Sequence, residues 1–469
     1  MVFSSMVFLW IFLPIVFLLG MIIRRPKYQN IILLVASLIF YAWGEPRYVF
    51  LLLFSVTMNW AFGLCIDRFA AHRKLFLVLA VVGNLGLLGY FKYCNFFLNT
   101  LDHLLPWVNI PRTSIALPIG ISFFTFQAMS YVIDLYRGEY KVQKNLLNLA
   151  LYISFFPQLI AGPIVKYRDI DAQITHRTIS RQRIAEGFRR FLYGLAKKVI
   201  VSNLVAVSVD RIFALEIGQM TGAAAWCGAI LYTLQIYYDF SGYSDMAIGL
   251  GRMFGFDFLE NFNYPYISSS IREFWRRWHI SLSTWFREYL YIPLGGNRKG
   301  KTRTYVNLWI VFAMTGLWHG ASWNFVGWGL YHGFFSVIER MGLGRFLKKV
   351  PLLAHVYTLL VVVVGWVFFR VESVRLGLQV VERMFMPWRF TTSDVSLLTL
   401  VSPLTITVAV LAILGCGLFQ SLFSRGRLLT LAQKWKYSLP EAVFCVLLFL
   451  YCILLLASNT YNPFIYFRF

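Results

Sequence analysis

Charged side chains are scarce in this sequence. Only 14% of its 469 residues are Asp, Glu, Lys or Arg, whereas 58% are hydrophobic. A soluble domain of ordinary composition carries about a quarter charged residues. The composition therefore excludes a soluble globular protein and predicts a polytopic membrane protein.

Paired cysteines are also missing. The six cysteines lie within or beside apolar runs and show no paired spacing: Cys65, Cys94, Cys227, Cys416, Cys445 and Cys452. A disulfide framework or a zinc site would need such pairs. We therefore expect small core residues at these positions and no bound metal.

No alternation of apolar and polar residues, as in a membrane β-barrel, is visible. Instead, apolar runs of about 20 residues recur, each long enough to cross a bilayer as a helix that satisfies its own backbone hydrogen bonds. The predicted fold class is an all-α polytopic membrane protein. Without an internal repeat, low-complexity tract or linker, we expect one transmembrane domain over residues 1–469 with about 10–12 membrane segments.

The net charge of +23 comes from short basic clusters between the apolar runs. Clusters placed this way follow the positive-inside rule and indicate topology and lipid contact rather than nucleic-acid binding. Arg24-Arg25-Pro26-Lys27 is expected in the cytoplasm, so both termini are expected outside it. The first apolar run lacks a basic leader and a small-residue cleavage site, and we expect it to be a retained span.

One apolar run does not fit this scheme. Residues 146–165 have basic segments on both sides and contain Pro157 and Gly162-Pro163, which break helices. The run is interpreted as a re-entrant segment, with an ordinary span that violates the charge rule as the alternative. Later spans are expected at about 352–370, 397–423 and 439–459.

The most polar and aromatic stretch, residues 271–323, holds two histidines forty positions apart, His279 and His319. His319 follows an apolar run that starts near Tyr305, and two short apolar halves meet at His319-Gly320. We expect this turn to lie within the membrane layer, where an ionisable residue is costly and hence a functional candidate. An imidazole can act as a general base near neutral pH. The alternative is a structural histidine that bonds a neighbouring helix.

His279 lies in a basic, tryptophan-rich segment. At helical spacing one face is predicted to carry Arg272, Trp275, His279 and Ser283, with Arg276 and Arg277 pointing elsewhere. Arginines bind phosphates in a bidentate way and tryptophan can stack on a nucleobase, so Trp275, Arg276 and Arg277 are candidates for binding an anionic cofactor near the cytoplasmic side. An interfacial helix anchored in lipid headgroups is the alternative.

Weaker candidates lie elsewhere. Asp239 and Asp245 fall in an expected span, where carboxylates must face protein or water, so this segment is predicted to line an interior cavity. The glycine-rich basic loop 294–301 lacks the spacing of a nucleotide-binding loop. The remaining histidines, His332 among them, are expected to be structural.

Several motifs resemble the membrane-bound O-acyltransferases, in particular the bacterial branch that O-acetylates exopolysaccharides such as alginate. The resemblance covers essentially the whole chain. It rests on Met1 to Ser5, Leu117 to Phe123, Phe155 to Pro163, Tyr238 to Asp245, Phe274 to His279, Gly316 to Gly320 and Asn462-Pro463-Phe464.

The resemblance implies a ring of tilted transmembrane helices with re-entrant segments around a central tunnel, which Asp239, Ser241 and Tyr243 are expected to line. It implies that His319 is catalytic, as a general base or as a transiently acylated residue, and that His279 assists. The expected acyl donor is cytoplasmic acetyl-CoA, with no permanently bound cofactor.

The resemblance further implies acceptors outside the cytoplasm. These are a separate acyl-accepting protein, a hydrolase-like acetyltransferase of the SGNH type, and finally a polysaccharide. The expected location is the bacterial cytoplasmic (inner) membrane. Transfer of another small acyl group, such as D-alanyl transfer in teichoic acid synthesis, is one alternative, and a non-enzymatic transporter with a polar pore is another.

Overall fold

Helices form all of the regular structure in the residues that this computed structural model describes, which are 1–23, 25–108, 113–389, 395–423, 435, 437–458, 461–463 and 465. No strand occurs in these ranges. Within the described residues, five continuous helical stretches are long and apolar enough to cross a membrane: Val49–Arg68, Ala70–Leu104, Arg181–Phe213, Pro351–Arg370 and Leu439–Ser458. The predicted all-α polytopic class is confirmed, whereas the ring and its tunnel stay predictions.

The described chain divides into two compact units. The first comprises residues 1–191 and 244–259, and the second comprises residues 192–243 and 260–469. Two helices contribute residues to both, namely α10 (Arg181–Ala196) and α12 (Gly222–Met253). The expected single transmembrane domain stays a prediction.

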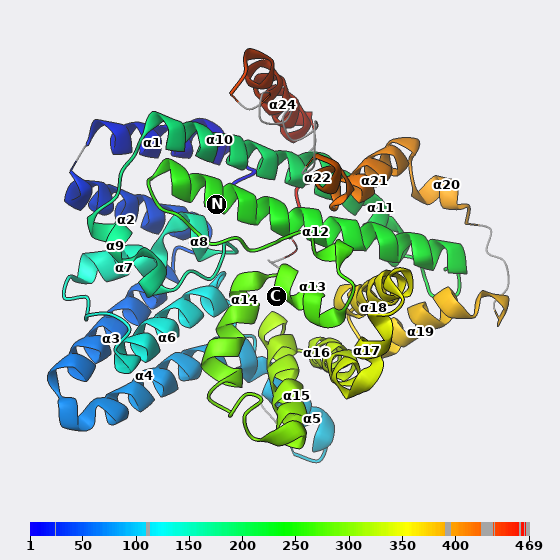
Figure 1. Cartoon of the computed structure of the whole chain (residues 1–469), viewed down its shortest axis with the longest axis horizontal. Helices are drawn as coiled ribbons and strands as arrows, with labels where there is room; N and C mark the ends of the chain where they lie inside the picture. The colour runs from blue at the N-terminus through cyan, green and yellow to red at the C-terminus, as the bar shows by residue number, and fades with distance from the viewer. Residues whose placement is uncertain are drawn as a thin grey trace. The chain divides into compact units, whose positions relative to one another are not determined.

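The first unit consists of the helices of the N-terminal part of the chain, together with residues 244–259. Before α10 they are η1 (Phe8–Phe12), α1 (Leu13–Ile22), α2 (Pro26–Ala42), α3 (Val49–Arg68), η2 (Ala70–His72), α4 (Arg73–Leu88), η3 (Gly89–Tyr93), α5 (Cys94–Leu104), α6 (Ile121–Arg137), α7 (Leu146–Ser154), α8 (Phe156–Leu159) and α9 (Tyr167–Thr175). Helices α3, α4 and α6 pack against one another (Figure 1). Buried Asn59 and Asn84 exchange side-chain amide hydrogen bonds of 3.1 and 2.7 Å, which link α3 to α4.

The apolar run 146–165 is broken, as its sequence indicates. Helix α7 ends at Ser154, Phe155 is non-helical, and α8 begins with Pro157 in its first turn. Proline is tolerated there because the first amides of a helix have no intrahelical partner. The break is confirmed, and the re-entrant path through a membrane stays a prediction.

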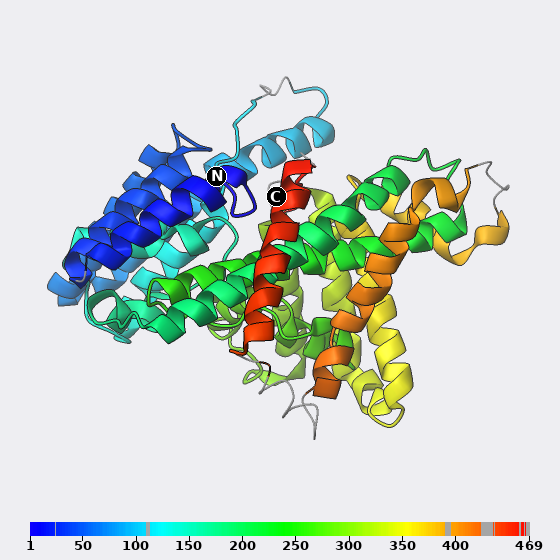
Figure 2. The same ribbon diagram turned by 90° about the horizontal axis from the view of Figure 1, so that it is seen from above.

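The second unit contains every candidate site residue. After α12 it comprises η5 (Pro265–Ile267), α13 (Ile271–Arg277), α14 (Ile280–Phe286), η6 (Arg287–Tyr291), α15 (Gly300–His319), α16 (Trp323–Ile338), η7 (Glu339–Leu343), α17 (Gly344–Leu347), α18 (Pro351–Arg370), α19 (Val374–Phe385), η8 (Pro387–Arg389), α20 (Leu397–Leu400), α21 (Pro403–Gly415), α22 (Leu418–Phe423) and α24 (Leu439–Ser458). Before α12 it contains η4 (Lys197–Ser202) and α11 (Asn203–Phe213). In Figure 2, α24 is the red helix, and it contacts η4.

Helices α15 and α16 form a tight hairpin that holds His319 at its turn (Figure 1). Two glycines allow the close approach. A Cβ atom on Gly316 would lie 2.2 Å from the Phe325 carbonyl oxygen, and one on Gly329 would lie 2.2 Å from the Phe312 carbonyl oxygen. Small residues at such a crossing let two backbones meet. The predicted meeting of two halves at His319-Gly320 is confirmed.

The expected span 397–423 is not one helix, so this prediction is wrong. The chain forms α20, α21 and α22 instead. The first break lies at Ser402-Pro403, where the Ser402 hydroxyl accepts a 3.1 Å hydrogen bond from the Thr405 amide and caps α21. The second lies at Gly417, whose φ of +139° no helix contains.

Candidate active site

His319 is the last residue of α15, and the extended Gly320 ends the helix there. His319 is 3% exposed, and its ring is enclosed by aromatic rings. The ring centroids of Trp328 and Phe369 lie 5.1 and 5.3 Å from that of His319, both nearly perpendicular to it. A cage of this kind excludes water from the imidazole.

His279 lies between two short helices rather than within one. Helix α13 ends at Arg277, and α14 starts at Ile280. His279 adopts a left-handed conformation with φ of +42°. The predicted single face through Arg272, Trp275, His279 and Ser283 is therefore wrong, because the helix it assumed is interrupted. A non-glycine residue in this conformation costs about 1–3 kcal/mol and is typical of functional sites.

Asn261 fixes the orientation of the His279 ring. Its Oδ1 accepts hydrogen bonds from the Ser281 amide (3.2 Å) and the Ser281 hydroxyl (2.9 Å), and lies 3.2 Å from His279 Nδ1. Because Oδ1 only accepts, Nδ1 of the neutral imidazole carries the hydrogen and donates it. Nε2 of His279 therefore carries the lone pair.

The structure brings the two histidines together. Their ring centroids lie 6.4 Å apart, and that of Trp318 lies 5.8 Å from His279. Both histidines are buried. Two imidazoles at this spacing can both reach one small reacting group.

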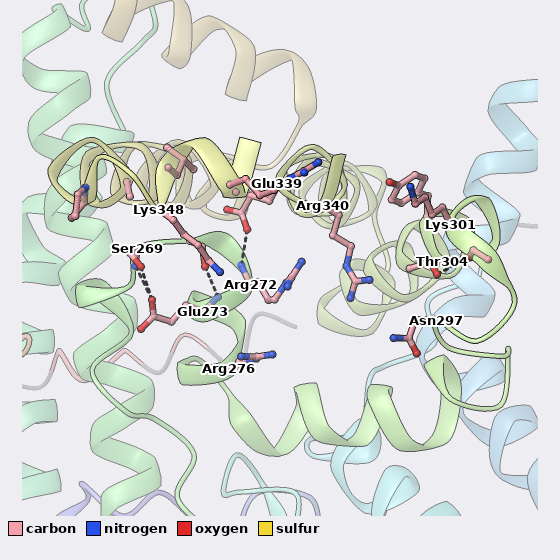
Figure 3. A pocket seen from close by; sticks show the side chains of 18 residues that line it. Ser269, Arg272, Glu273, Arg276, Asn297, Lys301, Thr304, Glu339, Arg340 and Lys348 are labelled. Carbon is pink, nitrogen blue, oxygen red and sulfur yellow. Dashed lines mark hydrogen bonds between the residues drawn. The ribbon is translucent and has the colours of Figure 1, made fainter. Parts of the chain in front are cut away.

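A large basic cavity of about 960 Å³ opens beside α13, α15 and η7. Six basic side chains line it with only two acidic ones: Arg272, Arg276, Lys301, Arg340, Arg345 and Lys348 against Glu273 and Glu339. Figure 3 shows Arg272 and Arg276 of α13 and Arg340 of η7 reaching into this space. Such a cavity suits a large, multiply charged anion.

The two acidic residues of the basic cavity have structural partners. Glu339 accepts backbone hydrogen bonds from Ile271 (2.6 Å) and Arg272 (3.3 Å), and so caps the start of α13 (Figure 3). Burial raises the pKa of Glu339. Burial, and then the charge of Arg340, lowers the pKa of the Arg272 guanidinium.

A smaller inner cavity of about 540 Å³ shares Arg272, Arg276 and Arg340 with the basic cavity. Trp275 and Phe312 also line it. Of the three candidate cofactor-binding residues, Trp275 and Arg276 thus face a cavity. Arg277 instead pairs with Glu273 at 2.9 Å and lines none of these spaces.

A third cavity, the polar cavity, has a volume of about 590 Å³. It is lined by Asp210, Gln235, Ser322, Asn324, Phe369 and Arg370, among others. Phe369 is also a wall of the His319 cage. The polar cavity therefore adjoins His319 through that ring.

Helices α15 and α18 relate the cavities to one another. Along α15, Lys301 and Thr304 line the basic cavity, Leu308 and Phe312 line the inner cavity, and His319 ends the helix. Helix α18, which is long and apolar enough to span a membrane, places Pro351 in the basic cavity and Arg370 in the polar one. Its 20 residues extend about 30 Å. The basic cavity and the polar cavity thus lie at opposite ends of a potential spanning helix.

Sequence comparison identifies the family of the chain. The profile of the membrane-bound O-acyltransferase family matches residues 139–381, which include both histidines and all residues that line the basic cavity. The chain belongs to the membrane-bound O-acyltransferase family. It is therefore an O-acyltransferase enzyme and a multi-pass membrane protein, and the transporter alternative is set aside.

Relatives of this O-acyltransferase carry related names. The chain is 42% identical to a Pseudomonas putida protein named probable alginate O-acetylase, with 100% of both chains covered. It is 36% identical to the peptidoglycan O-acetyltransferase of Helicobacter pylori, over 82% of this chain and 80% of that one. It is 30% identical to the teichoic acid D-alanyltransferase of Bacillus subtilis, over 46% and 56%.

The three candidate tunnel residues of the acyltransferase lie on α12. Asp239, Ser241 and Tyr243 are all buried, and none of them lines the three cavities described above. Asp239 instead forms a buried ion pair with Lys198. Their role in a tunnel stays a prediction.

Several residues beside the acyltransferase site were not candidates from the sequence, and His332 was expected to be structural. His332 is fully buried between Trp275 and Trp328, with ring centroids 5.2 and 5.1 Å away. Among the described residues, neither ring nitrogen of His332 has a hydrogen-bond partner. His332 lies 13 positions after His319, and Trp328 touches both rings. Asn261 and Arg340 carried no recognisable signal.

Proposed function

We propose that this enzyme moves an acetyl group from cytoplasmic acetyl-CoA to a hydroxyl group on the other side of the membrane, with His319 at the point of transfer. The observation that carries the proposal is the position of the buried histidine pair, with a basic cavity toward one end of α18 and a polar cavity toward the other. The basic end follows the positive-inside rule and is assigned to the cytoplasm.

The basic cavity supports the choice of donor. Coenzyme A carries several phosphate charges and an adenine ring, and Arg272, Arg276 and Arg340 supply matching guanidinium groups. Trp275 and the inner cavity lie on the way from that cavity toward the histidines. Only the narrow pantetheine arm of coenzyme A, and not its nucleotide part, passes through the inner cavity toward the histidines.

The reaction exchanges a thioester for an oxygen ester. His319 takes the proton of the acceptor hydroxyl while the hydroxyl oxygen attacks the acetyl carbonyl carbon. The carbon–sulfur bond of the thioester then breaks, and the proton passes from His319 to the leaving thiolate. His279 Nε2 is a hydrogen-bond acceptor in its neutral form and holds an amide N–H of the donor arm, which positions the thioester. Acid-quenching with labelled acetyl-CoA distinguishes this route from one through acetylated His319.

The names of the relatives suggest the final acceptors. The near full-length similarity to a probable alginate O-acetylase favours O-acetylation of an exopolysaccharide such as alginate. The immediate acceptor is proposed to be a separate acyl-accepting protein outside the cytoplasm, and the location a bacterial inner membrane. D-alanyl transfer is the competing activity. It is the weaker candidate, because the D-alanyltransferase matches less than half of this chain.

The test is the O-acetyl content of envelope and secreted polysaccharide in cells that carry wild type, His319→Ala or His279→Ala at equal membrane abundance. The proposal predicts no O-acetylation with His319→Ala and a strong reduction with His279→Ala. Undiminished O-acetylation with His319→Ala would show that His319 takes no part in the reaction. D-alanine esters in place of acetyl esters would establish the competing activity.

A further inference from the structure

Four described residues near the C-terminus are held inside the second unit, three of them by polar contacts that their side chains or amides make and one by its carbonyl. We call Tyr461, Asn462, Pro463 and Ile465 the C-terminal clasp. The Tyr461 hydroxyl donates to Asp210, Asn203 donates a 3.1 Å side-chain hydrogen bond to Asn462, and the Ile465 amide donates a 2.9 Å hydrogen bond to Asp239. The clasp is therefore fixed by residues of α11 and α12.

A buried ion pair provides the central anchor. Lys198 and Asp239 pair with side chains only 2% and 1% exposed. Each also bonds the clasp, since Lys198 donates to the Pro463 carbonyl and Asp239 accepts from the Ile465 amide. A buried ion pair is tolerated only when further hydrogen bonds satisfy its remaining donors and acceptors. The clasp supplies two of them.

The clasp also reaches the polar cavity. Pro463 and Ile465 line it, together with Ser322, Asn324 and Phe369 near His319. Asp210, which accepts from Tyr461, also accepts a 2.8 Å hydrogen bond from Arg370, and both of these residues line the same cavity. The anchored segment is thus a wall of the space that adjoins the His319 cage.

We propose that the C-terminal clasp is a wall of the acceptor site, and that the side chain of Ile465 limits the size of the hydroxyl compound that reaches His319. This inference rests on the proposed function, which assigns the polar cavity to the acceptor. Lys198 and Asp239 act through the clasp and are positioning residues. Their buried charges fix the position of the clasp, so its apolar side chains exclude large acceptors from one defined part of the polar cavity.

The first experiment measures acceptor selectivity with the purified full chain in proteoliposomes. The donor is acetyl-CoA, and a mannuronate dimer and a mannuronate hexamer replace the acyl-accepting protein as hydroxyl acceptors of two sizes. Ile465→Ala is expected to raise kcat/KM for the hexamer relative to the dimer by about tenfold, and Ile465→Trp to lower that ratio by a similar factor. The KM for acetyl-CoA stays unchanged in both. Leu454→Ala, at a 63% exposed position of α24, is the matched control.

Equal effects on both acceptors, or a changed KM for acetyl-CoA, would show that Ile465 has only a structural role. A second experiment does not require catalysis. In His319→Ala protein, Ile465→Cys is labelled with a membrane-impermeant maleimide from either side, and wild-type Ile465 gives the background. The inference predicts labelling from the extracytoplasmic side alone, slowed by the dimer. Labelling from the cytoplasmic side, or no slowing, overturns it.

The two experiments separate the inference from the proposed function. If wild type transfers nothing from acetyl-CoA while Ile465→Cys is labelled from outside and protected, the donor assignment fails and the clasp stands. If His319→Ala loses transfer while the Ile465 variants keep wild-type selectivity, the proposed function stands and the clasp fails.

Discussion

Asn261 Oδ1 and His279 Nδ1 lie 3.2 Å apart, and this one contact determines which nitrogen of the His279 ring carries the lone pair. Asn261 and His279 are both fully buried, and two hydrogen bonds from Ser281 hold the amide oxygen in place. The ring therefore cannot turn over without breaking this set of contacts.

Replacing Asn261 tests that relationship. Asn261→Ala is expected to lower kcat by about 10- to 100-fold, because His279 loses its orientation, as ligand histidines do when their hydrogen-bond partners are removed. Asn261→Asp keeps the accepting oxygen, so its kcat should stay close to that of wild type and well above that of Asn261→Ala. Steady-state kinetics in proteoliposomes gives the comparison. If the two variants are equally impaired, the oxygen of Asn261 is not what matters.

The arginines shared by the basic and inner cavities should control donor affinity. Arg276→Gln and Arg340→Gln are each expected to raise the KM for acetyl-CoA about tenfold with little change in kcat, because each removes a charged hydrogen bond to a phosphate. Arg277→Gln is the matched control, since Arg277 pairs with Glu273 and lines neither cavity. A rise in KM for Arg277→Gln of the same size would argue against a phosphate site.

Glu339 gives the donor site a dependence on pH. Burial raises its pKa, so its negative charge disappears at a higher pH than that of an ordinary glutamate. An anion that binds nearby favours the neutral form, and the KM for acetyl-CoA should therefore fall as the pH falls through this pKa. Glu339→Gln keeps an acceptor for the Ile271 amide, and it should remove the change of the KM for acetyl-CoA with pH that wild type shows. Identical pH profiles for wild type and Glu339→Gln would exclude Glu339 as the cause.

The α15–α16 hairpin should be sensitive to added volume at its crossing. Gly316→Ala places a methyl group 2.2 Å from a backbone oxygen, and such overpacking is expected to cost about 3 kcal/mol or more. Gly327→Ala, on the same hairpin, meets nothing closer than 3.6 Å and is the control. Thermal unfolding in detergent should show a lower Tm for Gly316→Ala alone. Equal Tm values would mean that the helices do not approach this closely.

Much of the fold follows from local sequence rules. Apolar runs predicted the long helices, Pro157 predicted the break in 146–165, and the glycine after His319 marked the hairpin turn. The span 397–423 was mispredicted because hydropathy averages over Ser402-Pro403, where a cap and a missing amide hydrogen end the helix. Average hydropathy does not register a single cap.

The site was only partly accessible from the sequence. His319 was recognisable because an ionisable residue in an apolar setting is unusual, and His279 because it lies in a basic, tryptophan-rich segment. Asn261, Arg340 and His332 were not, since their relevance depends on which distant segments the fold brings together. The partnership of Asp239 with Lys198 and Ile465 is of the same kind, because it joins residues 41 and 226 positions apart.

The most direct test of the central claim uses proteoliposomes with a fixed orientation of the chain, labelled acetyl-CoA on the cytoplasmic side and a hydroxyl acceptor on the other. Labelled ester is measured in the acceptor compartment. Wild type should transfer the label across the bilayer, and His319→Ala should reduce the rate at least about 100-fold, the share that a general base contributes. Transfer by His319→Ala at the wild-type rate, or transfer only when donor and acceptor are on the same side, would contradict the account.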